Sequence, residues 1–159
     1  MAIDLIVVHS ISLPPGHFDG DAIRRLFTNT LDWNAHPYYE ELRGLEVSAH
    51  FLIERAGRTW QFVDCERRAW HAGRSCFDGR DNCNDFSIGI ELEGLEGGEF
   101  LATQYTALAR LCRALVRRYP VRHIAGHEHV APGRKADPGP GFDWLALRRA
   151  LGWPPRGFP

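Results

Sequence analysis

The clearest pattern in the chain is the alternation in FSIGIELEG, residues 86–94, where every second residue from Phe86 is apolar. A period of two is typical of a β-strand that packs one face on the core. The other face carries two carboxylates, Glu91 and Glu93, with Gly89 leaving space beside them. The pattern therefore predicts a strand suited to the centre of a sheet, with one apolar and one polar face.

Shorter apolar runs predict the remaining strands of the sheet. Branched residues dominate the first of these runs, which indicates a buried strand. Two others flank a two-residue turn and predict a hairpin. These strands are residues 3–9 (IDLIVVH), 50–55 and 58–63 around Ala56-Gly57, and 122–126, which leads to His127.

A helical period appears most clearly in residues 104–119, where Leu108, Leu111 and Leu115 share one stripe and Thr103 is the predicted N-cap. Arginines fill the last turn, where they favour the helix dipole. Two shorter helices are predicted after capping residues: one after Asp21 that runs through Phe27, and one after Asp143 over residues 144–151.

Residues 29–48 and 64–85 lack either period and are predicted to be irregular, the second as a long loop. Strands interleaved with helices, together with one hairpin, predict an α/β fold. We expect a single domain over residues 1–159, with a central mixed sheet flanked by helices.

Composition narrows the function classes. The 159 residues have a net charge of -1, which argues against nucleic acid or an anionic membrane as partner. No apolar run approaches the ~20 residues that span a bilayer, and the N-terminus lacks the features of a secretory signal. We therefore expect a cytoplasmic protein whose four cysteines are free thiols rather than two disulfides.

Two histidines and one aspartate follow predicted rigid elements. His9 ends the first strand, His127 follows a short strand, and Asp137 lies in a loop stiffened by proline and glycine. Two imidazoles and a carboxylate suit a zinc site that keeps one position open, as catalysis requires. The residues alone leave other trios among the eight histidines open, and His129 is a rival ligand.

Glu91 and Lys135 are the candidate catalytic groups. A partly desolvated carboxylate on a central strand has a raised pKa, in the range of a general base. Lys135 is the only lysine among 19 basic residues, and a compact ammonium differs from a guanidinium in reach and bulk. We interpret Lys135 as a charge that stabilises an oxyanion near a metal. The alternative is a surface lysine that survives in an arginine-biased chain.

Six blocks of sequence, in order along nearly the whole chain, resemble a known family. They are IVVHSISLPPGHF, NAHPYYEEL, VSAHFLIER, RAWHAG, CNDFSIGIELEG and GHEHVAPGRKADPGPGFDW. Together they resemble the cytoplasmic N-acetylmuramoyl-L-alanine amidases of the AmpD type. The resemblance implies a zinc-amidase fold. It also implies hydrolysis of the amide between the lactyl group of 1,6-anhydro-N-acetylmuramic acid and L-alanine in soluble muropeptides, during peptidoglycan recycling.

The same resemblance implies roles for individual residues. His9, His127 and Asp137 match the family's zinc ligands, Glu91 matches its catalytic glutamate, and Lys135 matches the lysine of its RKxDPGP motif. Glu93 matches no catalytic role. From their place in the long loop, Trp70 and His71 are expected to contact the sugar or peptide of the substrate, with packing anchors as the alternative. Ser10 is a further expected substrate contact. The expected partner is an anhydromuropeptide, with no nucleic acid or membrane partner, and we expect a monomer.

Three departures from the family pattern accompany the resemblance. Ser10 stands where the family usually has asparagine, which puts a substrate contact there in question. His129 stands where aspartate or asparagine is usual, and its imidazole is a candidate for a misplaced or competing contact with the metal. The chain also begins almost at its first strand, whereas many members carry a further segment. The two interpretations are that part of one groove wall is missing or that the sequence is truncated.

Three other functions stay open at this point. A secreted or phage-type amidase acting on polymeric cell wall is disfavoured by the absent signal and by the RKADPGP block. A peptidoglycan-recognition module that binds without hydrolysis would lack ligands that are all present here. A purely structural metal is disfavoured because three protein ligands leave one position open.

Overall fold

The computed structural model describes residues 2–153 and 157–159. The predicted domain, 1–159, includes residues 1 and 154–156, which lie outside the described part. In chain order the elements are β1 (Leu5–Ile11), α1 (Ala22–Phe27), α2 (Pro37–Glu40), β2 (Phe51–Ile53), β3 (Thr59–Gln61), β4 (Cys76–Phe77), β5 (Arg80–Asp81), the 3-10 helix η1 (Cys83–Asp85), β6 (Ser87–Glu93), α3 (Ala102–Arg118), β7 (His123–Gly126), α4 (His127–Val130) and α5 (Trp144–Leu151).

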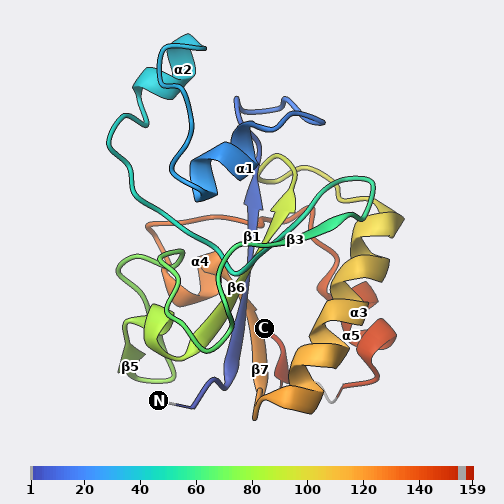
Figure 1. Ribbon diagram of the computed structural model, residues 1–159. Helices are drawn as coiled ribbons and strands as arrows, with labels where there is room; N and C mark the ends of the chain where they lie inside the picture. Colours follow the sequence, from blue (N-terminus) through green and yellow to red (C-terminus); the bar gives the residue numbers. More distant parts are fainter. Residues whose placement is uncertain (1, 154–156) are drawn as a thin grey trace.

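Five strands form the central sheet in the order β3-β2-β6-β1-β7, and β4 and β5 form a small second sheet (Figure 1). Strand β1 runs parallel to β6 and β7, β2 runs parallel to β6, and β3 runs antiparallel to β2. The predicted α/β fold with a mixed sheet and flanking helices is therefore confirmed. Among the described residues, no helix is long and apolar enough to cross a membrane.

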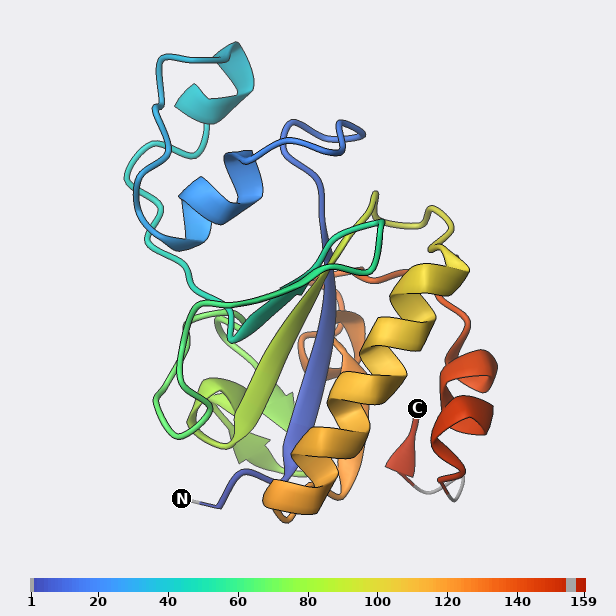
Figure 2. The same cartoon turned by 45° about the vertical axis from the view of Figure 1, so that its right-hand side comes forward.

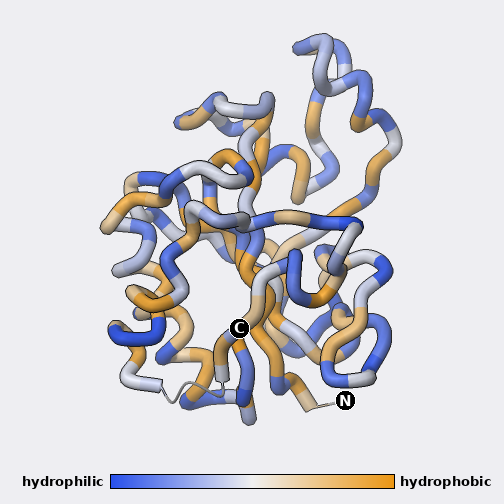
Figure 3. The backbone as a smooth tube through the Cα atoms, turned by 180° about the vertical axis from the view of Figure 1, so that it is seen from behind, coloured by the Kyte–Doolittle hydropathy of each residue, from blue (hydrophilic) through white to orange (hydrophobic). Residues whose placement is uncertain are grey.

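Strands β1 and β6 lie at the centre of the sheet, and each is covered on both faces. On one face Ile88, Ile90 and Leu92 pack against α3, as their period of two predicted, and α5 lies beside α3 (Figure 2). The tube in Figure 3 is hydrophobic along the strands at the centre of the molecule. This packing orients the alternate residues of β6 toward the opposite face.

The opposite face of the sheet is covered by the segment 64–85 and by α4 instead of a long helix. Leu5, Val7 and Phe86 pack there with Val130. The prediction that Phe86 shares a face with Ile88, Ile90 and Leu92 is therefore wrong, because Phe86 precedes β6 and its ψ of 14° is not that of a strand. Every residue of β6 is consequently buried, including its polar ones. Alternate residues of β6 therefore face two different buried layers, one on each side of the sheet. The two carboxylates of the strand lie in the protein interior instead of on its surface.

The start of α3 differs from the prediction. Its N-cap is Leu101, whose N–H donates to the side chain of Gln104 at 3.0 Å. Thr103, the predicted N-cap, lies inside the first turn, and its hydroxyl donates to the Arg55 carbonyl at 2.6 Å. The Thr103 hydroxyl therefore bonds to the β2–β3 turn instead of capping the helix, as its residue type had predicted.

Both segments predicted to be irregular contain regular structure. Helix α2 begins at Pro37, after His36, whose Nδ1 accepts the Tyr38 N–H at 3.1 Å. Histidine is an uncommon cap, so the capping rules did not indicate this helix. The segment 64–85 contains the β4–β5 hairpin and η1. These elements are only two or three residues long, too short for a period to appear.

The remaining local predictions are confirmed in part. Strand β1 continues to Ile11, two residues beyond His9, where the prediction ended it, and β2 and β3 are shorter than predicted. The Ala56-Gly57 turn joins β2 to β3, and Gly57 has φ +83°, which suits glycine. Asp143 caps α5 by accepting the Ala146 N–H at 2.8 Å. Asp21 occupies the N-cap of α1, but its carboxylate accepts from Arg25 instead of a backbone N–H. All four cysteines are free thiols, and Cys112 is buried in the core.

Candidate active site

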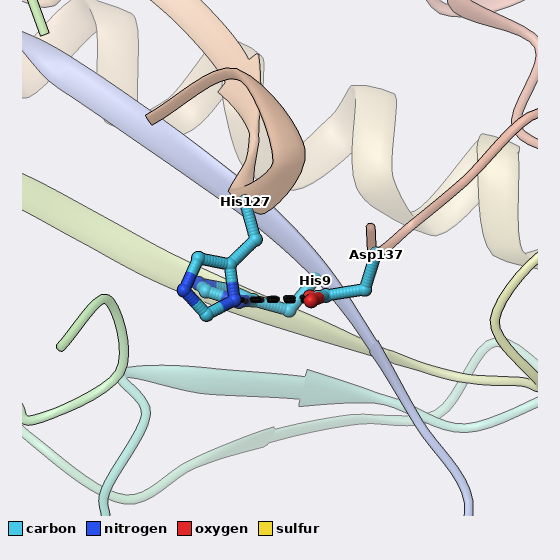
Figure 4. A group of neighbouring side chains, drawn as sticks. All are labelled: His9, His127 and Asp137. Atoms are coloured by element: carbon cyan, nitrogen blue, oxygen red, sulfur yellow. Dashed lines mark hydrogen bonds and ion pairs between the residues drawn. The ribbon is translucent and has the colours of Figure 1, made fainter. Parts of the chain in front are cut away.

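Three side chains from separate elements meet at the carboxyl end of the sheet (Figure 4). His9 lies on β1, His127 is the first residue of α4, and Asp137 comes from the loop between α4 and α5. The Nδ1 atoms of the two histidines are 3.0 Å apart, and each lies 3.2 Å from Asp137 Oδ2. The structure thus brings together the three residues predicted as metal ligands.

The loop that carries Asp137 is held against the end of β7. The Glu128 N–H donates to the Asp137 carbonyl at 2.9 Å. A side chain at Gly126 would place its Cβ 2.9 Å from Pro138 Cδ, so glycine is needed for the loop to approach. The prediction that proline and glycine would hold this aspartate in place agrees with the observed packing.

The donor set fits a metal ion. Tetrahedral ligands at about 2.0–2.1 Å from zinc lie roughly 3.3 Å from one another, close to the spacing of these three atoms. Burial lowers the pKa of His9 to about 4, although the neighbouring Asp137 carboxylate opposes this. Burial raises the pKa of Asp137, but the adjacent imidazoles of His127 and His9 outweigh it and hold that pKa below its usual range. At neutral pH the site therefore offers His9 neutral and Asp137 ionised, as metal binding requires.

Glu91 lies beside His9, because the two residues are paired in register between β6 and β1. Burial raises the pKa of Glu91 well above its usual range, and the charge of Asp137 raises it further, while Lys135 lowers it. The direction of this shift agrees with the prediction from the strand pattern. A carboxylate with a raised pKa is suited to accept a proton near neutral pH.

A cavity of about 240 Å³ lies over the cluster. Glu91 and the metal-ligand candidates line its polar end, and the exposed side chain of Lys135 lies at the same end. Its apolar wall comes from α1, α2 and the segments that flank them, through Leu13, Leu26, Phe27, Tyr38, Leu42, Leu45 and Val47. The arrangement offers a reacting centre at one end and a surface for a larger ligand at the other.

The three predicted substrate contacts lie in different surroundings. The Ser10 hydroxyl is buried beside the cavity and has no hydrogen-bond partner in the described part of the chain. Trp70 is 59% exposed at the cavity rim, with the Arg68 guanidinium 3.8 Å from its ring centre. His71 is buried, and its Nδ1 lies 2.9 Å from His9 Nε2. His71 thus contacts a metal-ligand candidate.

His129 is not part of the three-residue cluster, which comprises His9, His127 and Asp137 among the residues described. Its Nδ1 accepts the Gly126 N–H at 2.9 Å, and its ring packs against Trp144. This side chain therefore caps α4. Histidine at this position therefore supplies an acceptor for the helix N-terminus, as an aspartate or asparagine side chain can.

Sequence reasoning missed the groups that surround the two histidines. The Ala72 carbonyl lies 3.0 Å from His127 Nε2, and a backbone carbonyl leaves no signal in a sequence. Asn84 is buried, and its side chain accepts the N–H groups of His71 and Ala72. Its place in the block CNDFSIGIELEG is the one signal that could have drawn attention to it.

A family model described as N-acetylmuramoyl-L-alanine amidase matches residues 1–140. This chain belongs to that family. It is 53% identical over 146 residues to the 1,6-anhydro-N-acetylmuramyl-L-alanine amidase AmpD of Citrobacter freundii, which covers 91% of this chain and 78% of the relative. The predicted family and enzyme class, an N-acetylmuramoyl-L-alanine amidase, are confirmed.

Solved amidase structures agree with this assignment. The crystal structure of a selenomethionine AmpD derivative superposes with a TM-score of 0.93 at 51% identity, covering 95% of this chain and 86% of that one. The AmpDh3 protein of Pseudomonas aeruginosa, solved in complex with anhydromuramic pentapeptide, has a TM-score of 0.72 at 30% identity. That match covers 94% of this chain and 59% of AmpDh3.

Proposed function

We propose that this amidase depends on zinc and cleaves the bond between the lactyl group and L-alanine of soluble anhydromuropeptides, during peptidoglycan recycling in the cytoplasm. The observation that carries the proposal is the convergence of two imidazoles and a carboxylate beside the buried Glu91, under a cavity. The AmpD relative named for 1,6-anhydro-N-acetylmuramyl-L-alanine and the AmpDh3 complex with anhydromuramic pentapeptide support the substrate class. We also propose that the protein acts as a monomer.

His9 and His127, each through Nδ1, and the Asp137 carboxylate would hold the zinc ion. A zinc ion so held supplies Lewis acidity and lowers the pKa of a bound water. The chain's own groups supply the proton transfers and the positioning.

Glu91 acts as the general base. Its carboxylate accepts a proton from the water that attacks the lactyl carbonyl, and its raised pKa lets it retain that proton long enough to deliver it to the leaving amine of L-alanine. Lys135 stabilises the oxyanion of the tetrahedral intermediate with its ammonium group. It is suited to this because its flexible side chain is exposed at the cavity.

Ser10 and Trp70 are proposed to contact the substrate. The Ser10 hydroxyl is a buried polar group that finds no hydrogen-bond partner among the described residues, and a ligand that supplies such a partner gains free energy of binding. Trp70 presents an exposed aromatic face at the cavity rim, suited to a sugar or peptide group. A substrate contact for His71 stays a prediction, and the contact between His71 and His9 favours the different role argued below.

The test is mass spectrometry of the products formed from an anhydromuramyl-tripeptide, with and without a chelator. We expect release of the intact tripeptide, its loss on chelation, and its recovery when zinc is restored. Absence of chelator-sensitive peptide release would remove the proposal. A parallel assay on intact sacculi separates it from a cell-wall-degrading amidase, which would act on the polymer at least as well as on the soluble fragment.

A further inference from the structure

Two consecutive residues contact the outer nitrogens of both histidine ligands. His9 Nε2 lies 2.9 Å from His71 Nδ1, and His127 Nε2 lies 3.0 Å from the Ala72 carbonyl. The inner Nδ1 atoms of the same two rings face Asp137. One short piece of chain therefore contacts the side of each ring that points away from the proposed metal.

The donors and acceptors around His71 can be assigned by starting from the Cys83 carbonyl, where the chain of hydrogen bonds ends. A backbone carbonyl can only accept, so the Ser87 hydroxyl donates to the Cys83 carbonyl at 2.6 Å. Ser87 Oγ then accepts from His71 Nε2–H, 3.4 Å away. A neutral imidazole protonated at Nε2 has an unprotonated Nδ1, which accepts from His9 Nε2–H.

The consequence for both ligands is the same tautomer. With its proton on Nε2, His9 presents the Nδ1 lone pair to Asp137 and the metal position. His127 Nε2 lies 3.0 Å from the Ala72 carbonyl, which can only accept, and 3.4 Å from Arg134 Nη2, which can only donate. The shorter contact favours a proton on Nε2 of His127 as well. The Cys83 carbonyl thus favours the metal-binding tautomer of His9, by way of Ser87 and His71. The Ala72 carbonyl favours the same tautomer of His127 directly.

The segment His71–Ala72 is itself held in place. The Asn84 side-chain oxygen accepts both of its N–H groups, at 3.1 and 2.8 Å, and Asn84 is buried. The His71 ring lies directly over Gly89, where an added Cβ would come 2.4 Å from His71 Cγ. The space that glycine leaves in the β6 pattern is therefore occupied by this ring.

We propose that His71 is a positioning residue, which holds His9 in the Nε2–H tautomer and so presents its Nδ1 lone pair to the metal. This inference rests on the proposed zinc site. His50 shows that burial alone does not create the role. It is also buried and also donates from Nε2, in its case to the Arg67 carbonyl, but its Nδ1 accepts the Gly89 N–H and contacts no metal-ligand candidate.

The first experiment needs no substitution. Two-bond ¹H–¹⁵N NMR correlations of the metal-free protein near pH 7 report which nitrogen of each imidazole carries the proton. We expect His71 and His9 both to be protonated at Nε2. A His71 ring protonated at Nδ1 would overturn the proposal, because it could not accept from His9. Since no metal is present, this result is readable even if the zinc-dependent activity fails its own test.

The second experiment measures zinc affinity by competition with a chromophoric chelator. His71→Phe keeps a ring but removes the acceptor, and we expect affinity to fall ~10- to 100-fold, as for other outer-shell partners of ligating histidines. His71→Asn keeps an acceptor oxygen near the Nδ1 position and should restore most of it. His129→Asn, which changes a nearby histidine outside the cluster, is the matched control and should bind zinc like the parent.

Unchanged affinity in a folded His71→Phe variant would contradict the positioning role. Equal losses in the Phe and Asn variants would do so as well, because they would indicate a packing effect. If His71→Phe does not fold, the tautomer measurement on the parent protein still decides. If the parent protein does not bind zinc, the proposed function is contradicted. The tautomers measured in the metal-free protein then decide whether His71 positions His9.

Discussion

Glu91 and Glu93 lie two residues apart on the same face of β6, and both are buried, at 7% and 2% exposed. Their surroundings differ. The two oxygens of Glu93 accept the backbone N–H groups of Asp19 and Arg55, each at 3.0 Å. The Glu91 carboxylate has no hydrogen-bond partner in the described part of the chain, and burial holds its pKa well above the usual range.

The difference shows how one strand supports two functions. Glu93 joins the loops that follow β1 and β2 to the end of the sheet, so its charge is compensated and its role is structural. Glu91 faces a cavity instead of a loop, so its proton affinity stays high and a substrate can reach it. A carboxylate on this strand becomes structural where loop N–H groups bond to it, and stays available to a substrate where it faces the cavity.

The largest expected effect comes from Glu91→Gln. The variant keeps the shape of the side chain but cannot accept a proton, so kcat should fall by about 10²- to 10⁴-fold. Turnover of an anhydromuramyl-tripeptide and the zinc content of the variant are the measurements. Turnover within a few-fold of the parent, at full zinc content, would remove Glu91 from the mechanism.

The same variant should gain stability, and the sign follows from linkage. Folded Glu91 has a pKa well above the ordinary 4.5, so the folded state holds that proton more tightly than the unfolded chain does. The resulting stabilisation is complete below about pH 4 and is lost as pH rises through the folded pKa. Glu91→Gln stays neutral, so urea unfolding of the metal-free variant at pH 8 should show a higher free energy of unfolding than the parent.

The next largest effect is expected from Lys135→Arg. The guanidinium retains the charge but not the compact shape, so kcat should fall by roughly 10²- to 10³-fold, the loss typical of one oxyanion donor. Zinc content should not change, because Lys135 is not among the metal-ligand candidates. Near-normal turnover would refute the oxyanion role and would make the single lysine an ordinary surface residue.

Glu93→Gln should show the opposite profile to Glu91→Gln. An amide has only one acceptor oxygen, so one of the two backbone N–H groups loses its partner, at a cost of about 1–3 kcal/mol in the free energy of unfolding. Turnover of the folded variant should stay within a few-fold of the parent. A large loss of kcat without loss of stability would contradict the purely structural role of Glu93.

The smallest expected effect is a tenfold fall in kcat/KM per pH unit on the acid side of the profile. Protonation removes the general base, and because the pKa of Glu91 is raised, this limb should lie above the usual range of carboxylates. The Glu93→Gln variant should show the same limb. Zinc content measured at each pH separates protonation of Glu91 from loss of the metal.

Much of the fold could be predicted from local sequence patterns. The alternation from Ile88, the apolar run before His9 and the helical stripe of Leu108 all indicate apolar faces that pack in the core, which is a property of neighbouring residues. Starts of helices were less predictable, because a capping side chain has competing partners. Thr103 bonds to Arg55 across the molecule, and only the packed structure brings them together.

The candidate site divides in the same way. The sequence by itself indicated which residues we propose to carry the chemistry, since His9, His127, Asp137, Glu91 and Lys135 lie in motifs that resemble the amidase family. Tertiary structure alone decided how each one is used. The tautomer proposed for His9 and the contrast between Glu91 and Glu93 depend on side chains, N–H groups and loops distant in sequence, and the capping role of His129 depends on the local fold of α4. Hydrogen bonds and burial of this kind are set by the spatial environment, which a linear pattern does not contain.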